Sequence, residues 1–381
     1  MSVASTHSTG PIARNESRDE VPAPIVLVTT ADASGSTGLQ GRLAERGMSA
    51  RIVYGPDRAS SRAHPFTERW RQILAGRKIA CTSGLPYPSL IHAVGTRCAD
   101  LAVELASRWK CPYLLTIEEF LCPGARLRLA RRWCRGVIVP GADLADDLIG
   151  NLGVPSRLVT IVRPGVPAAT TPPATPSPSC RPVVGTAVGS GFGSGLPTFL
   201  DAARMVLASG TEVEFVLAEL GSGTALARRL AEGLAIAERI TITEGIDLGR
   251  SFWPLLDVYA HTSRQPSSGR PLLNAMAHGI PSIASQVPGL REIAAGGECA
   301  CIVPPGDAEA LAATILGLLS DRVDAEGVGS KGRDRILADY APEREADALV
   351  GLYRAAIESS TGAGGRHRSD AAASAVASRR S

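Results

Sequence analysis

Short apolar runs and longer amphipathic stretches alternate through most of this chain. In the first half, runs such as "PIVLVTTA" and "CPYLLTI" are separated by stretches such as "ADLAVELASRWK", where Leu101, Leu105 and Trp109 share one helical stripe. The short runs are typical of buried parallel strands, and the periodic stretches are typical of the helices that connect them. This alternation predicts a parallel sheet with helices on both of its faces.

A proline-rich segment interrupts the alternation near the middle of the 381 residues. The stretch "VPAATTPPATPSPSC", Val166–Cys180, is too poor in large apolar side chains to pack a core and is typical of a semi-rigid linker. The alternation then begins again. The predicted fold class is therefore α/β, with two doubly wound Rossmann-like domains that face each other across a cleft. In such sheets ligands bind at the carboxyl ends of the strands, so we expect the site in this cleft.

These patterns divide the chain into six predicted segments. They are a disordered N-terminus (1–22), a first Rossmann-like domain (23–165), the linker (166–181), a second Rossmann-like domain (182–342), a C-terminal helix (343–358) and a disordered tail (359–381). Residues 1–22 lack the apolar core of a secretory signal, and no apolar run approaches the roughly 20 residues of a membrane span. The eight cysteines form no CxxC pair, which favours a reducing compartment and predicts a cytoplasmic protein.

The charge is nearly balanced, with 40 basic and 37 acidic side chains and a formal net charge of +3. Because nucleic-acid binding needs a concentrated basic face, we expect no nucleic-acid partner. Basic residues do concentrate in "RLRLARRWCR", which we interpret as an amphipathic helix. This helix has two interpretations, a contact with an anionic membrane or saccharide and an ordinary solvated face. Its arginines are Arg126, Arg128, Arg131, Arg132 and Arg135.

A glycine-rich loop, "GSGFGSG", follows the first predicted strand of the second domain. Its glycines occupy alternate positions, at Gly189, Gly191, Gly193 and Gly195. A dinucleotide fingerprint needs G-x-G-x-x-G, and neither possible start gives that spacing. No lysine is near, which excludes the P-loop pattern. Two interpretations remain, a backbone that approaches an anion at a helix start and a turn of small residues.

The second half resembles the family 4 glycosyltransferases. The stretch "VYAHTSRQPSSGRPLLNAMAHGIPSIASQVPGLREIAAGGECACIVPPGDAEALAATI", Val258–Ile315, matches the order and spacing of the family's longest motif, and a weaker resemblance extends over about residues 24–356. The resemblance implies the GT-B fold, with the acceptor on the first domain and a nucleotide sugar on the second. It also implies retaining transfer to a glycan or lipid-linked acceptor in cell-surface polysaccharide biosynthesis. No metal or other cofactor is implied, because the nucleotide sugar is a substrate.

The family's charged residues are replaced in this chain. The family usually carries two glutamates eight positions apart, and here Pro266 and Asn274 occupy those positions. The family's lysine in the diphosphate loop corresponds to Ser194, and its arginine to Gly189 or Ser190. A first-domain histidine corresponds to Glu118, which we interpret either as a base or sugar ligand or as a surface carboxylate.

Neighbouring residues are candidates to replace the lost charges. Arg264 and Arg270 flank the lost glutamate position at Pro266, and arginine binds phosphate bidentately. We expect His92 to face the cleft on the acceptor side, and Glu292 to have a structural role at a helix start. The predicted donor-binding residues are Gly189, Gly191, Gly193, Ser194, Gly195, Arg264, Gly269, Arg270 and Asn274. Two functions fit this pattern, an active glycosyltransferase and an inactive relative that binds a nucleotide, a saccharide or a partner enzyme.

Overall fold

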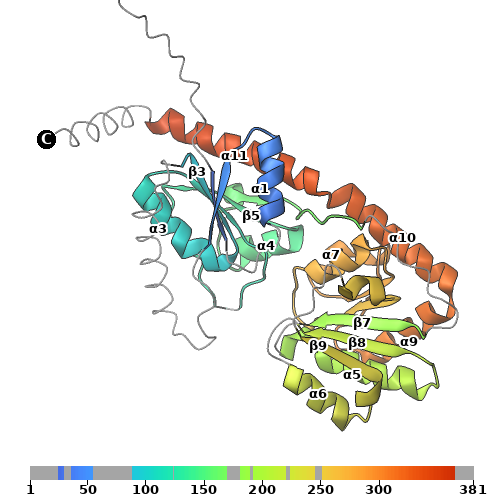
Figure 1. The fold of residues 1–381 in the computed structure, drawn as a ribbon. Helices are drawn as coiled ribbons and strands as arrows, with labels where there is room; N and C mark the ends of the chain where they lie inside the picture. Colours follow the sequence, from blue (N-terminus) through green and yellow to red (C-terminus); the bar gives the residue numbers. More distant parts are fainter. Residues whose placement is uncertain are drawn as a thin grey trace, which may run out of the picture.

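Two parallel sheets form the centres of two α/β domains in the computed structural model (Figure 1). The structure describes residues 25–29, 36–54, 88–122, 124–169, 181–188, 192–219, 224–244 and 251–364. The predicted N-terminal segment 1–22, most of the linker (170–180), Gly189 and Gly191 lie outside these residues.

The first sheet has its described strands in the order β2-β1-β3-β4-β5-β6, all parallel. These strands are β1 (Ile25–Thr29), β2 (Ala50–Tyr54), β3 (Leu90–Val94), β4 (Tyr113–Thr116), β5 (Cys134–Val139) and β6 (Val159–Ile161). The helices are α1 (Ser36–Glu45), α3 (Ala99–Trp109) and α4 (Ala142–Gly150), with single 3-10 turns at Thr96–Cys98 and Ser156–Leu158. The predicted stripe of α3 is confirmed, since Leu101, Leu105 and Trp109 are all buried.

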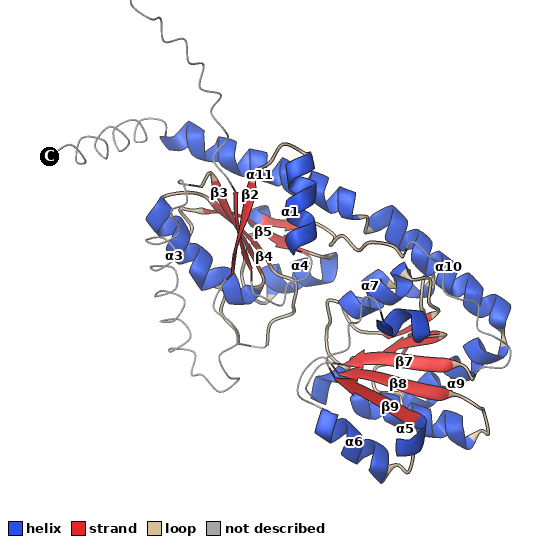
Figure 2. Cartoon of the chain, in the orientation of Figure 1, coloured by secondary structure: helices blue, strands red, loops and turns tan. Residues whose placement is uncertain are grey.

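The second sheet has the order β12-β11-β10-β7-β8-β9, again all parallel. Its strands are β7 (Val183–Val188), β8 (Glu214–Glu219), β9 (Ile240–Glu244), β10 (Val258–His261), β11 (Ser282–Ser285) and β12 (Cys301–Val303). Its helices are α5 (Leu196–Ala208), α6 (Thr224–Gly233), α7 (Arg270–Ala277), α8 (Leu290–Ile293), α9 (Ala308–Ser320) and α10 (Arg322–Asp339). Figure 2 shows this sheet between layers of helices.

The strand order of the second sheet positions the site. The chain runs outward from β7 through β8 to β9, then returns to β10 beside β7 and runs outward in the other direction. This is the strand order of a Rossmann fold, in which ligands bind where the direction reverses. The glycine loop after β7 and the loop after β10 both leave the carboxyl edge at this switch point.

The last helix, α11 (Pro342–Gly364), returns from the second domain and lies along the first (Figure 1). Its residues Leu349 and Tyr353 are buried in the same core as Ile25 and Leu27 of β1. The sequence predicts a helix over 343–358 and a disordered tail from 359, but α11 continues to Gly364. Val166, expected to begin the linker, is buried in the second domain and donates its N–H to the Tyr340 carbonyl at 2.8 Å.

The predicted basic helix over Arg126–Arg135 is wrong. The segment is irregular, turns at 131–133, and enters β5 at Cys134. Leu127 and Leu129 are half-buried against a hydrophobic core of the first domain, while the arginines that alternate with them are exposed. This period of two does not suit a helix, and the Tyr113 hydroxyl holds the segment by accepting the Ala130 N–H at 2.9 Å.

A second expectation holds only in part. The sequence predicts Leu226, Leu230 and Leu234 as the buried stripe of the helix over this region. Leu230 and Leu234 are half-buried against a core of the second domain, but Leu226 is 37% exposed. The fully buried positions of α6 are Ala227 and Ala231, one position further along. Small alanines lie at the contact because α6 packs closely against β9 and α5.

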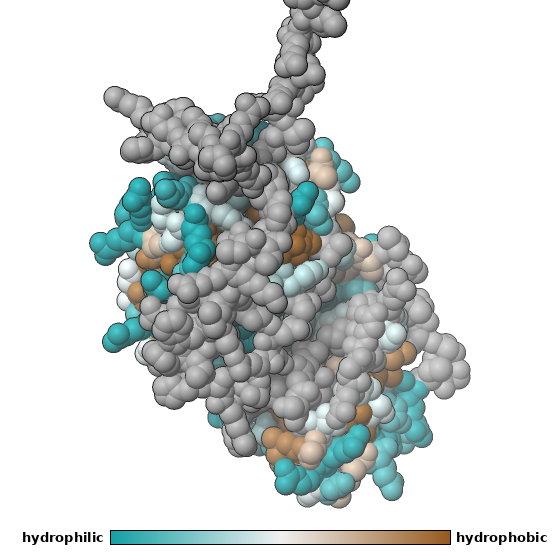
Figure 3. Space-filling model, turned by 60° about the vertical axis from the view of Figure 1, so that its left-hand side comes forward, coloured by the Kyte–Doolittle hydropathy of each residue, from teal (hydrophilic) through white to brown (hydrophobic). Residues whose placement is uncertain are grey.

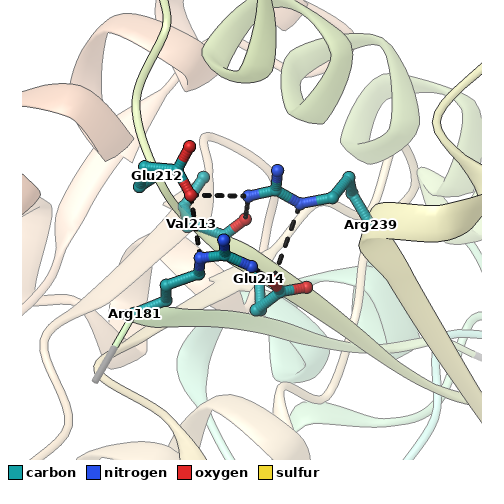
Figure 4. Close-up of polar contacts among 5 residues, drawn as sticks. All are labelled: Arg181, Glu212, Val213, Glu214 and Arg239. Carbon is teal, nitrogen blue, oxygen red and sulfur yellow. Dashed lines mark hydrogen bonds and ion pairs between the residues drawn. The ribbon is translucent and has the colours of Figure 1, made fainter. Parts of the chain in front are cut away.

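Charged side chains at the amino edge of the second sheet form the network of Figure 4. Arg181 pairs with Glu212 at 2.8 Å and with Glu214 at 3.0 Å, and Arg239 pairs with the same two carboxylates at 3.7 and 3.6 Å. Arg239 also donates to the Val213 carbonyl at 2.9 Å. The network joins the starts of β7, β8 and β9, at the edge opposite the switch point, so its charges lie away from the candidate site.

Hydrophilic residues dominate the described surface in the view of Figure 3, and the hydrophobic ones gather in small separate patches. Within the described residues, none of the helices combines the length and apolar character that crossing a membrane requires. Six cysteines in the same residues are free thiols, three of them buried.

Candidate functional site

The loops after β7 and β10 pack backbone to backbone. The Arg264 N–H donates to the Gly193 carbonyl at 2.9 Å, and the Thr262 hydroxyl donates to the Gly195 carbonyl at 3.1 Å. Gly195 has φ +75°, and a Cβ there would lie 1.6 Å from the Thr262 carbonyl oxygen. Only glycine fits both demands. The glycine at 195 is therefore explained by this packing alone, in line with the small-residue turn.

Two predicted donor-binding residues differ in how free their side chains are. Arg264 is exposed, lies beside Gly306, and has no carboxylate within ion-pair distance among the residues that the structure describes. The Arg270 Nη2 atom instead donates to Glu118 Oε1 at 2.8 Å, across the cleft between the domains. The structure thus brings together one candidate from each domain. Pro266 is exposed on the same loop as Arg264.

The start of α7 is fixed by close contacts. Gly269 has φ +62°, and a Cβ there would lie 2.4 Å from Ile293 Cδ1. Asn274, one turn into the helix, donates its amide to the Arg270 carbonyl at 3.0 Å. This internal bond uses one of the four hydrogen-bonding sites of the Asn274 side chain.

His92 lies elsewhere than the sequence predicts. It is expected at a strand end that faces the cleft, but it sits within β3 and is only 2% exposed. Its Nδ1 lies 2.6 Å from the Tyr353 hydroxyl of α11, and its Nε2 lies 2.7 Å from the Thr116 hydroxyl of β4. Burial lowers the pKa of His92 to about 4, so the ring is neutral at physiological pH. In this structure the side chain joins α11 to the first sheet.

Two carboxylates form reciprocal contacts between the domains. Asp143 of α4 accepts the Gly289 N–H at 2.7 Å, at the start of α8. Glu292 of α8 in turn accepts the Asp143 N–H at 3.4 Å, at the start of α4. Gly141 makes room for Glu292, since a Cβ there would lie 2.4 Å from Glu292 Oε2. Each carboxylate therefore lies at the positive end of a helix in the opposite domain.

A small pocket lies between the domains beside these contacts. Phe120 and Leu144 line it from the first domain, and Ser267, Leu273 and Ile293 line it from the second. Sequence reasoning missed Ser267 and the contacts of Asp143. No spacing in the chain marks them, because their partners come from another loop or from the other domain.

The two domains have the GT-B fold of glycosyltransferases. A sucrose-phosphate synthase from Thermosynechococcus elongatus superposes with a TM-score of 0.71 and 21% identity, over 88% of this chain and all of that one. Anabaena HepE in complex with UDP and glucose superposes with a TM-score of 0.68 and 15% identity, over 86% of this chain and 98% of that one.

Sequence comparisons identify the same kind of protein. Residues 181–321 match the glycosyl transferases group 1 family. An MMP alpha-(1->4)-mannosyltransferase from Mycolicibacterium hassiacum is 25% identical over 72% of this chain and 66% of its own length. The chain spans between a third and two thirds of the first curated relatives it matches, with shares of 33% and 66%. The group 1 match includes the glycine loop, the loop after β10 and α7, so the switch point lies within the glycosyltransferase-like region.

Proposed function

We propose that this protein is a glycosyltransferase that transfers a sugar from a nucleotide sugar to a glycan or lipid-linked acceptor, with retention. The observation that carries the proposal is the placement of two arginines after β10: Arg264 lies on the loop that packs against the glycine loop, and Arg270 begins α7. The family's usual cations are replaced in the glycine loop itself. Arginines on the facing loop supply charge to the same cleft, where a diphosphate leaving group needs it.

The ion pair between Glu118 and Arg270 has a role in this proposal. Both side chains are partly exposed, at 34% and 46%, so their mutual attraction contributes about 1 kcal/mol or less. A diphosphate carries more charge than one carboxylate and competes for Arg270 effectively. Its binding would release Glu118 into the cleft, where the carboxylate is free to accept a proton or a hydroxyl hydrogen bond from the acceptor.

Thermal unfolding of the purified protein tests the donor. Millimolar UDP, GDP, ADP and their sugar conjugates are added in turn, and the unfolding temperature is compared with that of the free protein. A ligand at 100 times its Kd adds roughly 2.7 kcal/mol to the free energy of unfolding. A shift with one sugar nucleotide identifies the donor, while no shift with any of them contradicts the proposal.

A second candidate is an inactive relative that binds a nucleotide, a saccharide or a partner enzyme. Pro266 favours it, because an exposed proline at the lost glutamate position offers no polar side chain to the transferred sugar. Release of nucleoside diphosphate from the bound sugar nucleotide, followed over time with candidate acceptors, separates the two. Binding with no release supports the inactive relative.

The setting of the reaction is also part of the proposal, which assigns it to the cytoplasm, to cell-surface polysaccharide biosynthesis and to chemistry without a metal cofactor. Arg126 and Arg131 are exposed on the irregular segment before β5 and favour peripheral contact with an anionic membrane. Flotation with vesicles that contain anionic lipid, compared with neutral vesicles, tests this contact.

A further inference from the structure

A network of hydrogen bonds lies beneath the loop between β10 and α7. The network begins at Tyr259 of β10, whose side chain is fully buried beside β7. The Tyr259 hydroxyl lies 3.1 Å from His261 Nδ1, and His261 Nε2 lies 3.3 Å from Ser267 Oγ. The Gly269 N–H then donates to Ser267 Oγ at 3.3 Å. The network runs from β10 to the start of α7.

Burial determines which atoms of Tyr259, His261 and Ser267 carry the protons in this hydrogen-bond network. Tyr259 is fully buried, so its hydroxyl proton needs an acceptor, and His261 Nδ1 is the acceptor beside it. His261 is 8% exposed, and burial lowers its pKa to about 4, so the imidazole is neutral. A neutral ring that accepts at Nδ1 carries its proton on Nε2. We assign that proton to a hydrogen bond with Ser267 Oγ.

Ser267 is consequently left with a proton to donate. Its oxygen accepts from His261 Nε2 and from the Gly269 N–H, which occupies both lone pairs. Its main chain is held as well, since its N–H donates to the Pro288 carbonyl at 3.2 Å and Gly289 packs against its carbonyl oxygen. The residue is half-buried and lines the pocket between the domains. Its hydroxyl is a fixed donor at the edge of that pocket.

We propose that Ser267 binds the sugar nucleotide by donating its hydroxyl proton to a ligand oxygen, and that Tyr259 and His261 are positioning residues that orient it. The inference rests on the proposed function and adds to it a specific contact. The ligand oxygen belongs either to the sugar or to the diphosphate, since both accept hydrogen bonds. A fixed donor of this kind needs no reorganisation when the ligand arrives.

Calorimetric titration of the full chain tests the contact at Ser267. The titrants are UDP, GDP and ADP, each compared with UDP-glucose, GDP-mannose and ADP-glucose. Ser267→Ala should weaken binding by roughly three- to tenfold, the usual effect of one ligand hydrogen bond, while Ser267→Thr keeps the hydroxyl and should stay within about twofold. A loss confined to the sugar nucleotide assigns the contact to the sugar, and an equal loss with the nucleoside diphosphate assigns it to the phosphates.

Two further results would overturn the contact, and they can be told apart. Unchanged binding by Ser267→Ala overturns it and leaves the proposed function standing. A natural chain that binds none of the six compounds overturns the contact together with the proposed function.

The roles of His261 and Tyr259 need measurements that a purely structural effect would not reproduce. In the unsubstituted protein, His261→Phe should weaken binding of the sugar nucleotide. In a protein that already carries Ser267→Ala, adding His261→Phe should cause no further loss of affinity. A loss of equal size in both backgrounds contradicts action through Ser267. Nitrogen chemical shifts of the histidine rings, recorded without ligand, should show His261 neutral with its proton on Nε2. A proton on Nδ1 of His261 would overturn the assigned directions of these hydrogen bonds. This test does not depend on whether the His261→Phe variant folds.

Discussion

Arg270 takes part in two competing interactions in the proposed function, one with Glu118 and one with the donor. Arg270→Ala should weaken binding of the nucleoside diphosphate by roughly tenfold, because a charged hydrogen bond to phosphate is lost. Glu118→Gln is the matched control. It removes the competitor for Arg270 and should leave binding unchanged or a few-fold tighter. Titration calorimetry measures both, and weakening of equal size in the two variants would contradict the competition.

Gly195 illustrates a residue whose identity is set by its neighbours. Gly195→Ala places a methyl group against the Thr262 carbonyl oxygen in addition to forcing alanine into positive φ. Gly210→Ala isolates the second effect. Gly210 has φ +83°, and among the described residues beyond its chain neighbours no heavy atom lies within 4 Å of where its Cβ would be.

We expect Gly210→Ala to lower the free energy of unfolding by about 1 to 2 kcal/mol, the cost of left-handed backbone for alanine. Gly195→Ala should lower it by roughly 2 kcal/mol more, because the loops after β7 and β10 must separate. Urea unfolding of the two variants gives the comparison. If both variants lost the same free energy of unfolding, the contact between the loops after β7 and β10 would contribute nothing to stability, which would contradict the packing described.

At the scale of the element, periodicity predicted most strands and helices but failed where a segment is shaped by distant contacts. The strands around "PIVLVTTA" and "CPYLLTI" have apolar runs that suit a buried parallel sheet, and they form β1 and β4. The segment before β5 combines arginines at helical spacing with Leu127 and Leu129 at spacing two. The leucines decide the outcome because they pack on the first core, and that core is not visible in the local sequence.

The attachment of α11 to the first sheet should weaken in acid. The folded-state pKa of His92 is about 4, below the ordinary value of 6.5, so the unfolded chain binds the proton more readily between these values. The contribution of His92 is therefore complete above about pH 6.5 and is lost as the pH falls toward 4.

Lowering the pH from about 7.5 to 4.5 should reduce the free energy of unfolding by roughly 2 to 3 kcal/mol through protonation of His92 alone. His92→Gln has no ring to titrate, so its free energy of unfolding should fall less over the same range by about that amount. Urea unfolding at both pH values measures the difference between the two proteins, in which other titrating groups cancel. Parallel pH dependences would show that His92 does not contribute to acid sensitivity.

At the scale of the whole molecule, the sequence indicated two domains and a site between them, but not how the domains meet. The alternation and the group 1-like motif placed Arg264, Arg270 and the glycine loop at strand ends, which the switch point explains. The pairing of Glu118 with Arg270 and the exchange between Asp143 and Glu292 join residues about 150 positions apart, with separations of 152, 146 and 149. Such contacts depend on the relative placement of two folded bodies, which no local pattern encodes.

The reciprocal contacts of Asp143 and Glu292 should hold the domains together. Each carboxylate meets backbone N–H groups or a helix start of the other domain, so removing its charge weakens the interface without altering either sheet. Asp143→Asn combined with Glu292→Gln should therefore increase the radius of gyration in small-angle scattering and speed amide exchange around α4 and α8. Arg291→Gln is the control, because that side chain is 60% exposed and lies 3.8 Å from Asp143 at the rim. Unchanged scattering and exchange in the double variant would contradict this role of the two carboxylates.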